Sequence, residues 1–389
     1  MRIGLLTYHH VVNIGSVLQT YCSYNLLTQL FPQAQVEIID HVPAVSEAFK
    51  ARHRKVTKAK GLFAKDVENE FILTERAYDR FLRQRCKHGP RLGVTNDHKA
   101  VMEAITQAGY DVVFVGSDTV FQLDGYFGEP IADDYPPNAY YLPGLRGPKK
   151  VGLAVSFDPY TDQPKERDKL SEVATLLQAF DHVLYRDSTA EGLLRDAGYP
   201  ADRMGHIPDP TVMMDITHLV PPGGAGRSAD ALPKAGVAVA DERLLQHVRQ
   251  ALQEAGYDVL DYMHPPNQVT DAVDPATVVG NALNGYRELD LMVTDRFHGS
   301  ILTLQVSDAN VIGIENAGRY SQPNSKLRDL YERLGIGDHL IRCGSEGPDP
   351  AVFADLLKKR SWDRAIMMQR MATLRAQGFA SVSAALSAL

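Results

Sequence analysis

The chain carries a compact group of reactive side chains at residues 290–300, which read DLMVTDRFHGS. The apolar run Leu291–Val293 is typical of a buried strand. Arg296, His298 and Gly299 follow it, at the point where a helix is expected to begin. A permanent cation and a titratable imidazole at a helix N-terminus favour anion binding and proton transfer, because that end of a helix carries a partial positive charge.

Both side chains also have a structural interpretation. Arg296 could form an ion pair with the neighbouring Asp295, and His298 could do no more than cap the start of the helix. Open α/β sheets bind their ligands outside the carboxyl ends of strands, and this is where the two residues are expected. The predicted position therefore favours a functional role for both.

The bulk composition excludes several classes of protein. The 389 residues are 44% hydrophobic and 23% charged, as in a globular protein long enough for two cores. A net charge of -7 argues against a general nucleic-acid binder. The three cysteines are far apart and outside any CxxC pattern, which suits a reducing compartment and argues against structural zinc. No metal-ligand spacing or redox-cofactor motif appears, so we expect no metal and no cofactor in a cytoplasmic protein.

Strand-like apolar runs alternate with helical patterns along the chain, which predicts mainly parallel sheets with helices on both faces. A stretch rich in proline, glycine, alanine and serine at residues 219–235 is the predicted linker. We therefore predict a Rossmann-like domain at residues 1–218 and a second one at residues 236–348. Residues 349–389 are expected to form C-terminal helices that pack across the junction. The predicted fold class is α/β, with two Rossmann-like domains in a GT-B-type arrangement and a C-terminal helical segment.

Several short blocks carry a resemblance to a known family. Their order and spacing are more specific than any single block, and together the chain resembles the polysaccharide pyruvyl transferases. The blocks are Asn13–Tyr21, Gly116–Asp118, Ser156-Phe157, Tyr185–Asp187, Asp209–Thr211 and Thr294–Gly299.

The resemblance implies a reaction and a set of roles. Such enzymes take pyruvate from phosphoenolpyruvate and place it as a ketal on two hydroxyls of a sugar. Phosphoenolpyruvate would be the co-substrate, and residues 1–218 would form the acceptor side. By resemblance, Arg296 binds the phosphate or carboxylate of the donor, and His298 acts as the acid or binds phosphate. The donor must be protonated at C3 to make C2 electrophilic, and an acid supplies that proton.

Arg186 ends a predicted strand, and the resemblance makes it a second donor clamp. It could equally pair with Asp187 beside a helix cap formed by Ser188 or Thr189.

Asn13, Gly15 and Ser16 open the first predicted helix, and the resemblance makes them substrate-binding residues. A glycine at a helix start lets the backbone approach an anion. An asparagine cap with a glycine needed only for the turn would explain the same residues.

Ser117 and Asp118 follow a predicted strand at Asp111–Val115, and both are expected to face the cleft predicted between the two domains. Asp118 could take the proton of an attacking hydroxyl, or it could cap a turn or helix. Phe121 stands where the family pattern leads us to expect a tryptophan, and its ring could still offer a flat face to a sugar.

Two further cationic features have weaker functional interpretations. Lys326 begins a predicted helix and could contact substrate, although a surface lysine is the default. The basic run at residues 52–60 could touch an anionic membrane surface or the diphosphate of a lipid-linked saccharide, or could simply be a solvated face. Peripheral contact with the inner membrane face is therefore an open expectation.

The sequence thus predicts a pyruvyl transferase that acts on a sugar or lipid-linked saccharide in a polysaccharide or cell-wall precursor. One alternative is a GT-B glycosyltransferase that uses a nucleotide sugar, because fold alone does not decide function. Another is a non-catalytic sugar-binding protein of the same fold. The combination of Arg296, His298 and Arg186 disfavours that second alternative, since sugar binding alone needs no anion clamp beside an acid.

Overall fold

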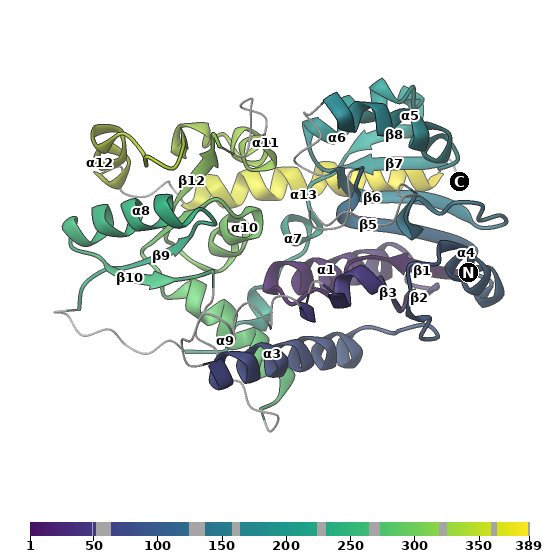
Figure 1. Cartoon of the computed structure of the whole chain (residues 1–389), viewed down its shortest axis with the longest axis horizontal. Helices are drawn as coiled ribbons and strands as arrows, with labels where there is room; N and C mark the ends of the chain where they lie inside the picture. Colours follow the sequence, from purple (N-terminus) through teal and green to yellow (C-terminus); the bar gives the residue numbers. More distant parts are fainter. Residues whose placement is uncertain are drawn as a thin grey trace. The chain divides into compact units, whose positions relative to one another are not determined.

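The computed structural model divides into two compact units, each built around one parallel sheet (Figure 1). The first unit comprises Met1–Met214, Val269–Pro275 and Leu374–Leu389, and the second comprises Asp215–Gln268 and Ala276–Thr373. This arrangement confirms the predicted α/β class. The described residues are 1–48, 50–51, 64–123, 137–157, 164–223, 231–263, 273–318, 325–358 and 364–387. The centre of the predicted linker, residues 224–230, lies outside them.

The sheet of the first unit has six parallel strands in the order β2-β1-β5-β6-β7-β8. Most of its strand residues are buried, as expected for a parallel sheet covered on both faces. The central β1 pairs with β2 on one side and with β5 on the other. The strands are β1 (Arg2–Leu6), β2 (Gln35–Ile38), β5 (Val112–Phe121), β6 (Lys149–Phe157), β7 (His182–Tyr185) and β8 (Met204–His206).

Helix α1 (Ile14–Leu30) contacts β2, β5 and α3 (Ala64–Arg85), so most of its surface is buried (Figure 1). A short parallel pair, β3 (His41–Val42) with β4 (Gly93–Val94), lies outside the main sheet. The remaining helices of this unit are α4 (His98–Ala108), η1 (Ala139–Tyr141), α5 (Pro164–Gln178), α6 (Ser188–Asp196), η2 (Ala201–Arg203) and α7 (Pro210–Met213).

The sheet of the second unit has five parallel strands in the order β10-β9-β11-β12-β13. Its strands are β9 (Lys234–Ala238), β10 (Asp258–Asp261), β11 (Leu291–Thr294), β12 (Asn310–Asn316) and β13 (Leu340–Cys343). Its helices are η3 (Thr217–Leu219), α8 (Glu242–Glu254), α9 (Pro275–Arg287), α10 (Phe297–Val306), α11 (Lys326–Arg333), η4 (Gly337–His339) and α12 (Pro350–Lys358).

The chain ends in one long helix, α13 (Arg364–Ser387), which confirms the predicted C-terminal helical segment. Its residues up to Thr373 belong to the second unit, and those from Leu374 onward belong to the first. Within the described residues, no helix combines the length and the apolar character needed to cross a bilayer.

Strand β5 differs from its prediction, because it continues through Gly116-Ser117-Asp118 as far as Phe121. The residues beyond Val115 keep pairing with β6, and the register shifts between Asp118 and Phe121. Gly116 has a φ of +125°, and a Cβ there would collide with the carbonyl oxygen of Leu153 on β6. Only glycine fits this position, because it alone combines a positive φ with so close an approach of two strands.

We predict that Gly116→Ala lowers the free energy of unfolding by about 2 kcal/mol or more, since it adds a collision to the cost of a positive φ. The matched control is Gly147→Ala, where φ is +104° but nothing lies within 4 Å of the added Cβ. That variant should lose about 1 kcal/mol. Urea unfolding of both variants gives the comparison, and equal losses would contradict the close approach of β5 and β6.

Candidate functional site

The order of strands reverses once in each sheet, and this locates the candidate site residues. In the first sheet the reversal lies between β1 and β5, and in the second it lies between β9 and β11. Loops leave such a switch point in opposite directions, and α/β sheets bind their ligands there. Asn13–Ser16 follows β1, Gly116–Asp118 lies in β5, and Thr294–Gly299 spans the end of β11 and the start of α10. Three of the predicted blocks therefore lie at switch points.

Thr294 and Asp295 fix the backbone at the switch point of the second sheet. The fully buried Thr294 hydroxyl donates to the Ala238 carbonyl at 2.9 Å and accepts the Arg296 N–H at 2.8 Å. The Asp295 carboxylate accepts the N–H of Ala240 at 3.0 Å. Ala238 and Ala240 belong to the end of β9 and the residues after it. These two side chains thus tie the loops after β9 and β11 together.

Arg296 is the residue immediately before α10, and its side chain is 36% exposed. Its Nε lies 3.0 Å from Oδ1 of Asp295, so the ion pair considered as the structural alternative is present. Among the described residues, Asp295 is the acid that pairs with Arg296, and it meets Nε. A guanidinium has five N–H donors, so its two terminal nitrogens remain suited to an anion.

His298 is the second residue of α10, which begins one residue before the predicted start. Its half-buried ring packs edge-on against Phe297, with ring centroids 5.4 Å apart. A Cβ at Gly299 would lie 3.0 Å from Thr294 Oγ1, so glycine lets the helix start close to the strand end. Ser300 contacts the hydroxyl of the buried Tyr331 at 3.0 Å, which holds the first turn from its other end.

A cluster of charged residues that the sequence did not predict lies at β12, the strand beside β11. Glu315 on β12 is fully buried, and Arg328 Nη2 donates to its carboxylate at 2.8 Å. Arg342 on β13 contacts the same carboxylate at 3.3 Å. Burial alone would raise the pKa of Glu315, but the bonds from Arg328 and Ser325 outweigh burial and lower it. The predicted Lys326 begins the adjoining α11 and is half-buried.

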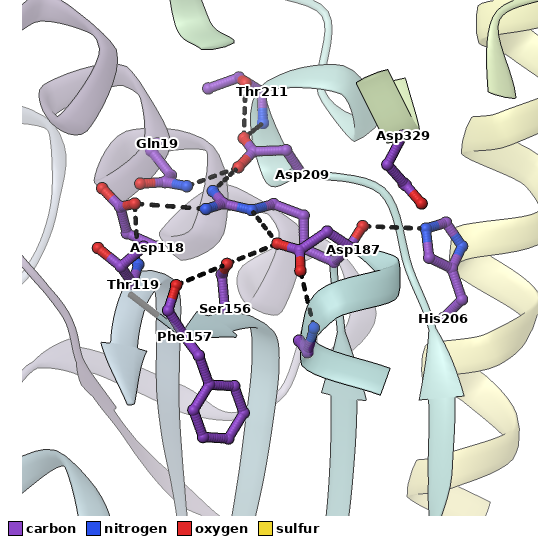
Figure 2. A network of polar contacts seen from close by, with 12 residues as sticks. Gln19, Asp118, Thr119, Ser156, Phe157, Asp187, His206, Asp209, Thr211 and Asp329 are labelled. Carbon is purple, nitrogen blue, oxygen red and sulfur yellow. Dashed lines mark hydrogen bonds and ion pairs between the residues drawn. The ribbon is translucent and has the colours of Figure 1, made fainter. Parts of the chain in front are cut away.

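At the first sheet, the guanidinium of Arg186 lies among three carboxylates. Figure 2 labels these acids, which are Asp118, Asp187 and Asp209. Asp209 is nearest, with Oδ2 2.7 Å from Nη1, and Asp118 Oδ1 lies 3.4 Å from Nη2. Asp187 is further away, at 3.9 Å from Nε. Burial disfavours the charged guanidinium, but the three carboxylates outweigh burial and raise the pKa of Arg186 above its usual value. Arg186 therefore stays charged while it is buried.

The contacts of Arg186 distinguish its two interpretations, a donor clamp and a partner of Asp187. Its principal partner is Asp209, not Asp187, and its side chain is 1% exposed. Asp187 is itself the N-cap of α6, where it accepts the N–H of Ala190 at 2.9 Å, so neither Ser188 nor Thr189 serves as the cap. An anion would have to displace a carboxylate to reach Arg186. The geometry favours a positioning role for Arg186 over a donor clamp.

Helix α1 supports this cluster from below with buried polar side chains. Gln19 donates to Asp209 at 2.6 Å, and the Ser23 hydroxyl contacts that of Ser117 at 3.1 Å. Ser117 is fully buried beneath α1, which corrects the expectation that it faces a cleft. Asp118 keeps a side-chain exposure of 16% and has a φ of +90°, an unfavourable region for a non-glycine residue.

Two other predicted residues have structural roles. The Asn13 side chain accepts the N–H groups of Gly15 at 2.7 Å and Ser16 at 3.4 Å, so it is the N-cap of α1. Phe121 is fully buried and stacks on Tyr141, with ring centroids 5.0 Å apart. Its ring lies in the hydrophobic core and not at a surface, which corrects the expectation that it offers a face to a sugar.

A buried histidine–aspartate pair was also missed. His9 follows β1, and its Nε2 lies 3.3 Å from Oδ1 of Asp40, which follows β2. Arg83 contacts the other oxygen of Asp40 at 3.1 Å. Burial alone would raise the pKa of Asp40, but His9 and Arg83 outweigh burial and lower it to about 2. The sequence does hold a signal for this pair, because His9 and Asp40 are polar residues that closely follow two neighbouring strands. The predicted basic run at residues 52–60 lies outside the described residues.

Residues 13–307 of the chain match the polysaccharide pyruvyl transferase family. No curated protein matches the chain.

Solved structures with a similar fold include two UDP-GlcNAc 2-epimerases. One, from Neisseria meningitidis, has 9% identity and a TM-score of 0.51, with 100% of each chain covered. The other, from Methanocaldococcus jannaschii, has 9% identity and a TM-score of 0.51, with 97% of this chain and 98% of that chain covered. At this identity the likeness concerns the fold alone, and it confirms the predicted GT-B-like class.

We predict that Arg186→Met lowers the free energy of unfolding by about 3–5 kcal/mol, because it leaves buried carboxylates without their cation. The control is Arg195→Met, which removes an exposed arginine paired with Glu191 on α6 and should cost less than about 1 kcal/mol. Adding Asp209→Asn to Arg186→Met should restore part of the loss. Urea unfolding measures all three, and equal effects at positions 186 and 195 would refute the buried-charge account.

Proposed function

Because the chain belongs to the polysaccharide pyruvyl transferase family, we propose that it transfers pyruvate from phosphoenolpyruvate to two hydroxyls of a sugar. The product would be a cyclic ketal in a polysaccharide or cell-wall precursor. The observation that carries the proposal is the Thr294–Gly299 run, which joins a cation, an imidazole and a helix start at a switch point. A donor with a phosphate and a carboxylate calls for such an arrangement.

The proposed donor site uses Arg296 as its fixed cation. Asp295 engages Nε of Arg296 at 3.0 Å and so orients the guanidinium, while the terminal nitrogens point their donors at the phosphate or carboxylate. The start of α10 adds its partial positive charge to the same region. Thr294 fixes the backbone of Arg296, so the cation is positioned before the donor arrives.

The proposed reaction begins with proton transfer from His298 to C3 of phosphoenolpyruvate. C3 becomes a methyl group and C2 becomes electrophilic. A sugar hydroxyl then forms a bond to C2 and gives up its proton to a base. The second hydroxyl displaces phosphate from C2, its proton leaves with the phosphate, and the ketal ring closes. The proton taken up by the base returns to His298 through solvent, so the net change converts one phosphoenolpyruvate and one diol into one ketal and one phosphate. A histidine suits the first step, because imidazole titrates near neutral pH.

For the acceptor, we propose that Asp118 is the base that takes the proton of the attacking hydroxyl. Its carboxylate keeps partial exposure, and Arg186 holds it from the buried side at 3.4 Å. Arg186 then acts as a positioning residue for Asp118. The acceptor class is a sugar, free or linked to a carrier, and we propose that the reaction takes place in the cytoplasm. The three buried free cysteines suit that reducing compartment.

We predict that His298→Ala slows phosphate release from phosphoenolpyruvate by about a hundredfold or more, because the variant lacks the acid that protonates C3. The assay measures phosphate release with a panel of saccharide acceptors, after binding of phosphoenolpyruvate has been confirmed for the variant. The control is His247→Ala, an exposed histidine on α8 of the same unit, which should keep wild-type turnover. Near-normal turnover in His298→Ala would refute the assigned role.

A further inference from the structure

A second candidate binding site lies in the first unit, away from the residues assigned above. It is a pocket of about 400 Å³, within the size range of small-molecule sites. Tyr24 of α1, Glu37 of β2 and Arg83 at the end of α3 line it. Arg85, Lys87 and His88 complete the polar part of its wall.

The pocket concentrates positive charge in a chain whose net charge is -7. Arg85 and Lys87 are exposed, and within the described part of the chain no carboxylate forms an ion pair with either of them. Glu37 is the acidic lining residue, and it is already engaged by Arg2 at 3.1 Å and by the Tyr110 hydroxyl at 3.2 Å. The pocket therefore presents two cations that lack an anionic partner.

The backbone holds these cations in place. Lys87 accepts the N–H of Ile38 through its carbonyl at 2.8 Å, and Gly89 donates to the Ile38 carbonyl at 2.9 Å. Residues 87–89 are thus fixed to the edge of β2. Arg85 is the last residue of α3, where a cation also offsets the helix dipole. That effect does not account for Lys87, which lies beyond the helix, or for the pocket itself.

We propose that this pocket binds the phosphate or diphosphate group of a small anionic molecule, with Arg85 and Lys87 as its principal ligands. Guanidinium and ammonium groups are the protein's strongest partners for phosphate oxygens. Arg83 adds a third cation, although it already forms ion pairs with Asp79 and Asp40. Tyr24 supplies a ring and a hydroxyl for the rest of the molecule. The proposal rests on the pocket and is independent of the proposed pyruvyl transfer.

His88 offers a local readout of binding. Its Nδ1 lies 3.1 Å from the Cys86 carbonyl, and its ring centroid lies 6.0 Å from that of His9. Burial lowers the pKa of His88, and the nearby His9 and Arg83 lower it further. An anion in the pocket opposes the effect of these neighbours, so binding should raise the pKa of His88. NMR titration of histidine-labelled protein, with assignment by His88→Gln, measures this change.

The main experiment is isothermal titration calorimetry of the full chain with inorganic pyrophosphate. We expect saturable binding that weakens at least about tenfold in Arg85→Gln/Lys87→Gln, which removes two charge-assisted contacts. The control, Arg91→Gln/Lys99→Gln, removes one arginine and one lysine from exposed positions of the same unit. It should bind pyrophosphate like the wild type. Arg296→Gln measures separately any pyrophosphate that binds at the proposed donor site. Lys87→Glu provides a second, single-site test of the same pocket.

The outcomes separate the two proposals. Equal weakening in both double variants would mean a general charge effect and would overturn the pocket. Absence of pyrophosphate binding to the wild type would overturn it as well. Loss of binding in Arg296→Gln alone would assign the anion to the proposed donor site instead. Turnover of phosphoenolpyruvate by Arg85→Gln/Lys87→Gln then tests the proposed function independently of pyrophosphate binding.

Two further probes distinguish the source of the phosphate group. Tighter binding of glucose 1-phosphate than of inorganic phosphate would support a sugar phosphate whose ring contacts Tyr24. Equal binding of both would support recognition of the free anion.

Discussion

Parallel strands place all their carboxyl ends at one edge of a sheet, and in both units neighbouring strands send the chain away from that edge in opposite directions. This order, β1 beside β5 and β9 beside β11, decides which side chains collect there. Residues far apart in sequence, such as Ser23 of α1 and Ser117 of β5, become hydrogen-bonding partners because of it. Buried side chains then fix these ends, as Thr294 does for the second sheet. The candidate chemistry depends on this order of strands.

The two sheets use their arginines in different ways. Arg186 is buried, and Asp209, Asp118 and Asp187 surround its charge, so it acts on its neighbours and not on solvent. Arg296 is partly exposed and meets Asp295 through Nε. A buried cation with three acidic neighbours stabilises its surroundings, whereas an exposed fork with one partner can still receive an anion. The difference explains why the donor is assigned to the second sheet.

The sequence predicted the features that depend on local pattern. The apolar run before Thr294 correctly indicated β11, and the helix that follows begins within one residue of its expected start. The interpretations of Ser117 and Phe121 failed because spacing does not reveal which strand residues pack beneath a helix or into the core. The partner of Arg186 lies 23 residues away on another strand end, whereas a local pattern offers only the neighbouring Asp187. Long-range contacts of this kind leave no local signal.

Isothermal titration calorimetry with phosphoenolpyruvate measures whether Arg296 binds the anionic donor. We expect saturable binding to the wild type that weakens at least about tenfold in Arg296→Gln, because a charge-assisted contact is lost. Arg243→Gln, at an exposed position of the same unit, should bind like the wild type. UDP serves as the comparison ligand. Equal affinity of the wild type and Arg296→Gln for phosphoenolpyruvate would show that Arg296 does not bind the donor.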